Sequence, residues 1–183
     1  YVTKYILDVI KSQCYYFFIR NVLSERGEHM IWDQERRSKA ERMEKAAGYA
    51  RGKRVGTEEI VPFLESVIRP GDRVVLEGCN QKQAAFLAGA LKEVNQGKVH
   101  DLNMIIPSIS RDEHLDLFDR GIASEINFSF AGVQSRRLAE MVAENTVKIG
   151  AIPTYLELYG RLYVALTPNV CLIAAGKADS TGT

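Results

Sequence analysis

Cysteine and histidine are both scarce in this chain of 183 residues, which contains three of each. The cysteines lie far apart and form neither a zinc-binding spacing nor an even-numbered disulfide framework: Cys14, Cys79 and Cys171. Such sparse usage is typical of proteins of the reducing cytoplasm, where we expect this one. The histidines likewise show no metal-ligand spacing, so we expect no metal site.

An excess of charge is also lacking, as are the two common nucleotide-binding fingerprints. The formal net charge is +1, so no overall positive field favours nucleic acid. The chain contains neither GxGxxG nor GxxxxGK[ST]. The apolar run Cys14–Ile19 is too short for a membrane span and has no convincing signal-peptide cleavage site. We therefore expect a protein that acts on neither nucleic acid nor membrane.

Composition divides the chain into three regions. Residues 1–29 differ from the rest, and we interpret them as an extension that is either a docking helix or non-native, with Met30 as the natural start. Residues 30–56 predict a charged helical segment that Asp33 caps and Gly52 ends. We interpret its basic side chains as a solvated face rather than as a surface for RNA or an acidic partner. Residues 57–183 predict part of one α/β domain.

The stretch from Arg69 to Leu91 has the order turn, strand, polar loop and helix. Pro70-Gly71 favours a tight turn, Arg73–Leu76 a strand and Ala84–Leu91 a helix. A polar loop at a helix N-terminus presents backbone N–H groups and the positive end of the helix dipole. These favour an anion such as a phosphate or a carboxylate, so the stretch is a candidate ligand-binding loop.

Further strands and helices alternate downstream. We expect strands at 99–106, 126–130, 148–152 and 170–175, and helices at 113–120, 135–144 and 154–163. This order predicts an α/β fold with a parallel sheet and helices on both faces, in which ligands bind beyond the C-terminal strand ends. Four loops are expected along that edge: Glu77–Gln83, Pro107–Arg111, Ala131–Ser135 and Ile152–Tyr155.

Glu77 is the first candidate for chemistry, because it is a carboxylate at a strand end. It could act as a nucleophile, a base or an acceptor, or it could simply bond to nearby backbone N–H groups. The polar residues after it offer amide donors and one cation to an acyl carbonyl or a phosphate, unless they are merely solvated: Asn80, Gln81, Lys82 and Gln83. Cys79 is a weak candidate nucleophile, since no histidine stands at a telling spacing.

Three long strings resemble one known family. They are RPGDRVVLEGCNQKQAAFLAGAL at 69–91, KVHDLNMIIPSISRDEHLDLFDRGIASEINFSFAG at 98–132 and IGAIPTYLELYGRLYVALTPNV at 149–170. In content and order they closely resemble the alpha subunits of bacterial malonate decarboxylase. Two positions depart from the family pattern, since Val133 replaces a proline and Pro153 a histidine.

The resemblance implies an acyl-carrier-protein (ACP) transferase with an incomplete N-terminal domain of the CoA-transferase-like (NagB/RpiA) fold. The implied reaction converts acetyl-ACP and malonate into malonyl-ACP and acetate. The implied partners are malonate, the decarboxylase subunits and the carrier subunit with its phosphoribosyl-dephospho-CoA prosthetic group, and no tightly bound cofactor is implied.

On this interpretation Glu77 is the catalytic candidate. The residues expected to contact substrate or carrier are Gly78, Asn80, Gln81, Lys82, Gln83, Gly132, Gln134 and Ser135. Two alternatives stay open. One is a CoA transferase or acyl-CoA hydrolase that acts on free CoA thioesters, and the other is a non-catalytic assembly subunit.

Overall fold

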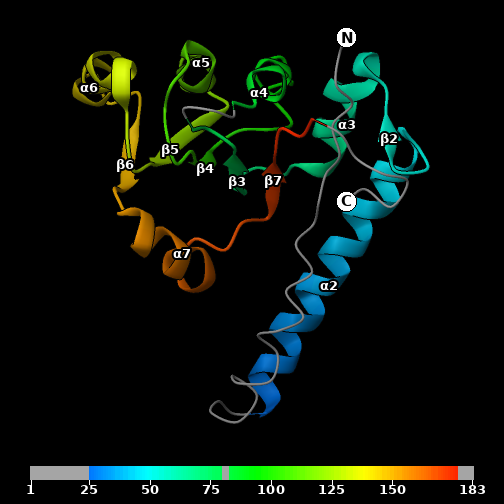
Figure 1. Ribbon diagram of the computed structural model, residues 1–183. Coiled ribbons are helices and arrows are strands. Elements are labelled where there is room, and N and C mark those ends of the chain that lie inside the picture. The colour runs from blue at the N-terminus through cyan, green and yellow to red at the C-terminus, as the bar shows by residue number, and fades with distance from the viewer. Residues whose placement is uncertain (1–24, 80–82, 177–183) are drawn as a thin grey trace.

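A five-stranded parallel sheet forms the centre of the domain (Figure 1). The computed structural model describes residues 25–79 and 83–176, with side chains from residue 33 onward. The strands lie in the order β6-β5-β4-β3-β7. Their bounds are β3 Arg73–Leu76, β4 Leu102–Ile105, β5 Ala123–Asn127, β6 Lys148–Ala151 and β7 Val170–Leu172. The α/β fold with a parallel sheet, expected from the sequence, is confirmed.

Helices lie on both faces of this sheet (Figure 1). On one face lie α4 (Ala85–Lys92), α5 (Asp112–Asp119) and α6 (Ser135–Ala143). They connect β3 to β4, β4 to β5 and β5 to β6, respectively. α7 (Tyr155–Val164) lies on the other face and leads back to β7, which pairs with β3. Because crossovers are right-handed, a reversal of direction along the sheet places the helix on the opposite face. The reversal makes the boundary between β3 and β7 a topological switch point, and α/β domains bind ligands beyond the carboxyl ends of the strands at such a point.

The hydrophobic core lies between the sheet and the helices on its α4 face. Leu76, Met104 and Ile126 from three neighbouring strands are fully buried, as are Leu91 of α4 and Leu115 of α5. The core therefore covers one face of these three strands.

One expected strand is misplaced. The alternation over 126–130 predicted a strand there, whereas β5 ends at Asn127. The backbone nitrogens of Ser129 and Phe130 donate to the Pro107 oxygen at 3.0 and 3.2 Å instead of continuing the ladder to β6. Phe130 is about half exposed, so the pattern beyond Asn127 belongs to a loop.

The N-terminal helix is longer than expected. α2 spans Glu25–Ala47 and its first half projects away from the domain (Figure 1). The prediction that Asp33 caps this helix is wrong, because good helix formers precede Asp33 and continue the helix through it. Gly52 does not end the helix either. It turns a short hairpin, β1 (Ala50–Arg51) and β2 (Arg54–Val55), with a φ of +67° that suits glycine. The predicted boundary at residue 30 falls inside α2 and stays a prediction.

A buried ion pair docks α2 on the domain. Arg42 donates to both oxygens of the Asp72 carboxylate and, at 2.8 Å, to the Val67 oxygen at the end of α3 (Ile60–Val67). Both side chains are nearly buried. One of the basic side chains expected on a solvated face is therefore part of the domain's interior.

Candidate functional site

Four loops meet at the C-terminal edge of the sheet, and we call their described residues the rim: 77–79, 83, 107–111, 131–135 and 152–155. Ser108 N donates to the Gly78 oxygen at 3.0 Å, and Ile109 N donates to the Phe130 oxygen at 2.8 Å. These bonds connect the ends of β3, β4 and β5 in sequence. The parallel topology thus brings the expected loops to one edge.

Glu77 lies at the end of β3, at the switch point. Its carboxylate accepts from Ala174 N at 2.7 Å, and its own backbone nitrogen donates to the Leu172 oxygen at 2.9 Å. Glu77 therefore joins the ends of β3 and β7, which is the acceptor role that the sequence left open. Its catalytic role is a separate prediction.

Gly78 allows the first two loops of the rim to pack closely. A Cβ atom at this position would lie 2.3 Å from the Ser108 oxygen and 3.1 Å from a ring carbon of His114. Gly78 also pairs with Gln83 in an isolated antiparallel bridge that closes the β3–α4 loop. Arg111 Nη1 donates to the Gln83 side-chain oxygen at 3.4 Å. The β-bridge thus holds Gly78 and Gln83 next to each other on the rim.

The remaining residues predicted for that loop lie outside the described part of the chain: Asn80, Gln81 and Lys82. Their predicted contacts with substrate or carrier stay predictions.

The third group of predicted site residues lies after β5. Gly132 and Gln134 belong to a 3-10 turn, in which Gly132 has a φ of +52°, and Ser135 begins α6 on an exposed surface. β4 separates β5 from β3, so this turn is displaced from Glu77 by two strand spacings, or about 10 Å. A single carboxylate does not span that distance, whereas an extended ligand does.

Three side chains on or near the rim, which the sequence did not single out as site residues, have buried polar atoms. The hydroxyls of Ser110 and Ser129 and both ring nitrogens of His114 have no hydrogen-bond partner among the described residues. An unpaired buried polar group costs about 1–3 kcal/mol. No local pattern marks these residues, because their burial results from packing between loops that are distant in sequence.

Burial favours the neutral form of His114. Burial lowers the pKa of its imidazole, while Glu113 raises the pKa and Arg111 lowers it to smaller extents. The ring belongs to the first turn of α5 and is fully buried. Its Cε1 atom lies next to Gly78, 3.1 Å from where a Cβ atom would stand. This histidine therefore packs against the β3 end of the rim.

The arginines closest in sequence to the rim loops pair with carboxylates. Arg111 donates to Glu113 at 3.2 Å and Arg136 to Glu140 at 2.9 Å. Arg137 donates to two carboxylates of α5, at 2.7 and 2.6 Å: Asp116 and Asp119. Arg137 therefore ties α6 to α5, and its contacts do not favour a role in binding phosphate.

The described residues offer no metal site, since they contain no cluster of three or more His, Cys, Asp or Glu side chains that could hold an ion. In the same ranges no helix is long and apolar enough to cross a membrane. Cys79 is a half-buried thiol outside any disulfide, and burial raises the pKa of the Cys171 thiol. These features add no second candidate centre to the rim.

A parallel sheet with a switch point and a rim of loops at its carboxyl edge defines the ligand-binding α/β class. Comparison with known proteins then shows that the chain belongs to the malonate decarboxylase alpha subunit family. The family model described as "Malonate decarboxylase, alpha subunit, transporter" matches residues 31–183. The resemblance seen in the three sequence strings is thereby confirmed.

Individual relatives agree with this family. An acetyl-S-ACP:malonate ACP transferase of Malonomonas rubra is 41% identical over 153 residues, which are 83% of this chain and 28% of the relative. The malonate decarboxylase alpha subunit of Acinetobacter baumannii is 50% identical, with a TM-score of 0.74 over 77% of this chain and 26% of that one. A Pseudomonas malonate decarboxylase hetero-tetramer, solved with malonate, contains a chain that is 52% identical with a TM-score of 0.75 over the same shares. The chain thus spans roughly a quarter of the length of these relatives.

Proposed function

We propose that the protein is an ACP transferase that converts acetyl-ACP and malonate into malonyl-ACP and acetate. The observation that carries this proposal is the family match over residues 31–183, which includes the whole rim. The curated relative at 41% identity is a transferase of that specificity. Since relatives are much longer than this chain, the proposal concerns the whole protein.

The shape of the rim supports a long ligand. Glu77 and the Gly132 turn are separated by about 10 Å across three strands. The thioester arm of a carrier protein is extended, and we propose that it runs along the rim from β5 towards the switch point. Gly78, Gln83, Gly132, Gln134 and Ser135 then contact the arm or the acyl group. Asn80, Gln81 and Lys82 are proposed contacts on their sequence position alone.

We place the catalytic carboxylate at Glu77, because the switch point is where such sheets bind their ligands. In one route Glu77 attacks the acetyl thioester, the C–S bond breaks, and an acetyl-glutamyl anhydride and the carrier thiolate form. The thiolate then attacks the glutamyl carbonyl and acetate leaves. A malonate carboxylate attacks the carbonyl of the resulting glutamyl thioester, the C–S bond breaks and the carrier thiolate is released. The malonyl-glutamyl anhydride so formed is cleaved by the thiolate at its malonyl carbonyl, which restores Glu77.

In the other route malonate itself attacks the acetyl thioester and releases the thiolate. The thiolate then attacks the malonyl carbonyl of the mixed anhydride and acetate leaves. The two routes differ in whether Glu77 becomes acylated. Borohydride reduces a glutamyl thioester and hydroxylamine traps an acyl-glutamyl group, so either reagent inactivates the enzyme in the presence of acetyl-ACP only in the first route.

The proposed partners follow from the family. The Pseudomonas relative was solved as a hetero-tetramer in complex with malonate, and we propose that this protein works in a comparable assembly with a carrier subunit and decarboxylase subunits. The phosphoribosyl-dephospho-CoA group of the carrier is then its substrate. A cytoplasmic location fits the reduced thiols of Cys79 and Cys171.

Incubation of the full-length protein with acetyl-ACP and labelled malonate tests the activity. We expect label on the carrier and release of acetate, and absence of transfer would rule the proposal out. A parallel incubation with acetyl-CoA separates it from a CoA transferase or hydrolase, which prefers free CoA thioesters. Binding of the carrier without turnover identifies a non-catalytic assembly subunit.

A further inference from the structure

α7 has the composition of an interior helix. Its ten residues, Tyr155–Val164, include only two charged side chains, Glu157 and Arg161, which pair with each other at 3.7 Å. The remaining side chains are aromatic or aliphatic apart from one glycine. A helix that is apolar nearly all round is normally buried in a protein.

No residue of α7 is buried within the described part of the chain. Leu156 is 90% exposed, Val164 84% and Tyr159 69%. Six large apolar side chains are exposed on α7 and immediately before it, and we call them the α7 face: Ile152, Tyr155, Leu156, Tyr159, Tyr163 and Val164. An exposed apolar cluster of this kind marks an interaction site.

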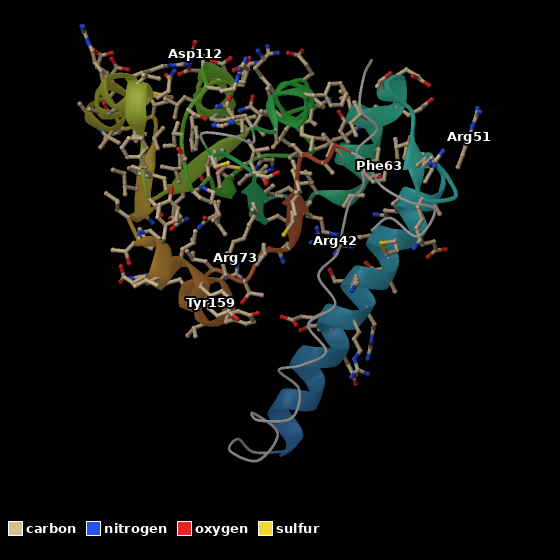
Figure 2. The ribbon with its side chains drawn as sticks, in the orientation of Figure 1. Arg42, Arg51, Phe63, Arg73, Asp112 and Tyr159 are labelled. Carbon is tan, nitrogen blue, oxygen red and sulfur yellow. The ribbon has the colours of Figure 1, made fainter. Side chains whose placement is uncertain are left out.

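The α7 face belongs to a well-formed helix. Thr154 and Glu157 form a capping box at its start. Beyond its end, Arg73 Nη1 donates to the Ala165 oxygen at 2.9 Å, and Figure 2 shows Arg73 in the region between β3 and α7, with Tyr159 on α7 itself. The rings of Tyr159 and Tyr163 pack edge to face, with centroids 5.1 Å apart. The exposure is therefore a property of a fixed surface and not of a frayed end.

We infer that the α7 face is an internal docking surface, covered in the full-length protein by polypeptide that its relatives possess outside the matched region. Two observations favour this occupant over a second copy or another subunit. The chain spans only 26–28% of those relatives, and the only two charged side chains on α7 pair with each other. The inference depends on family membership and not on the proposed reaction.

Thiol labelling tests the inference. Tyr159→Cys and Val164→Cys are introduced separately into the 183-residue chain and into the full-length protein, and the rate of maleimide labelling is measured against the unsubstituted proteins to subtract the native cysteines. We expect fast labelling of both cysteines in the 183-residue chain and at least tenfold slower labelling in the full-length protein. Arg136→Cys is the matched control, because the Arg136 side chain is 91% exposed on α6, and its labelling should change less than twofold.

Other outcomes overturn the inference. Equal labelling in both proteins shows that the added polypeptide leaves the α7 face open. Protection in the 183-residue chain, accompanied by a dimer in sedimentation, identifies a second copy as the occupant. Protection that appears only when the other subunits are added identifies a partner, and equal slowing at position 136 shows general shielding. None of these readouts depends on transferase activity.

Discussion

The backbone nitrogen of Ala174 donates to the carboxylate of Glu77 at 2.7 Å, although the two residues lie 97 positions apart in the chain. The bond joins the first strand of the sheet, β3, to the segment that follows the last strand, β7. Between them the chain runs to the far edge of the sheet and returns across the other face. The Glu77 carboxylate is thus held at the switch point by the return of the chain, which gives it a structural role beside the proposed catalytic one.

Substitutions at Glu77 separate the two roles. In Glu77→Gln the amide oxygen still accepts from Ala174 N, so we expect the free energy of unfolding to change by less than about 1 kcal/mol. The same substitution removes the carboxylate, and we expect transferase activity to fall by about 10²-fold or more. Glu77→Ala should lose both activity and about 1–2 kcal/mol of stability. Retained activity in Glu77→Gln, measured by label transfer from malonate, would reject the catalytic role.

Gly78→Ala should destabilise the domain, because the added Cβ would lie 2.3 Å from the Ser108 backbone oxygen. Backbone atoms cannot move aside as easily as a flexible side chain, and we expect a loss of about 1–3 kcal/mol in urea unfolding. Gly89→Ala is the matched control. Gly89 lies within α4, and apart from its neighbours and the backbone of the helix itself, no atom of the described residues comes within 4 Å of the place that an added methyl group would take. Alanine there should stabilise by up to about 1 kcal/mol. Similar effects at both sites would contradict the close contact.

Arg42→Met should loosen α2 from the domain. The substitution leaves the nearly buried Asp72 carboxylate without the guanidinium that contacts both its oxygens. Breaking a buried pair in this way costs about 3 kcal/mol or more. The exposed pair of Arg120 and Glu93, at 2.9 Å, provides the comparison, and Arg120→Met should change stability by less than about 1 kcal/mol. Urea unfolding followed by circular dichroism gives the free energy of unfolding of each variant. Equal losses of stability in the two variants would show that burial of the Arg42 pair is unimportant.

His114 should make stability depend on pH in the mildly acidic range. Burial lowers the pKa of its imidazole in the folded state, so the unfolded chain binds a proton more readily once the pH falls below about 6.5. The contribution is present above that pH and is lost as the pH falls further, with a slope of at most about 1.4 kcal/mol per pH unit.

His114→Leu should remove this dependence between pH 7 and 5 (about the window of histidine titration), as followed by urea unfolding at each pH. The carboxyl groups of Glu65 and Glu113, whose pKa values are lowered by bonds to Lys98 and Arg111, titrate at more acidic pH and should be unaffected. An unchanged slope in the variant would show that another group is responsible.

Most of the fold could be predicted because its signals are local. The β-branched residues of Arg73–Leu76 and the apolar run that contains β4 predicted two neighbouring strands at nearly correct positions. The errors arose where a local signal is ambiguous. Alternation over 126–130 continues into a loop, and Asp33 carries a cap residue's side chain in a helix that begins earlier.

The candidate site was predictable only in outline. The sequence placed Glu77, Gly78 and Gln83 on one loop at the carboxyl edge, since that position follows from the order of strand, loop and helix. It did not predict that His114 is buried beneath Gly78, or that Arg137 pairs with α5. These facts depend on which helices become neighbours, and strand order is not encoded in any single segment.

By itself, the sequence determined the alternation of strands and helices, and with it a parallel sheet whose loops gather at one edge. It also determined family membership through long ordered strings. Only the tertiary structure decided the order β6-β5-β4-β3-β7, the bond between Glu77 and Ala174, and the exposure of the α7 face. The physical reason is range: propensity and periodicity act over a few residues, whereas strand order, burial and ion pairing are set by contacts between segments tens of residues apart.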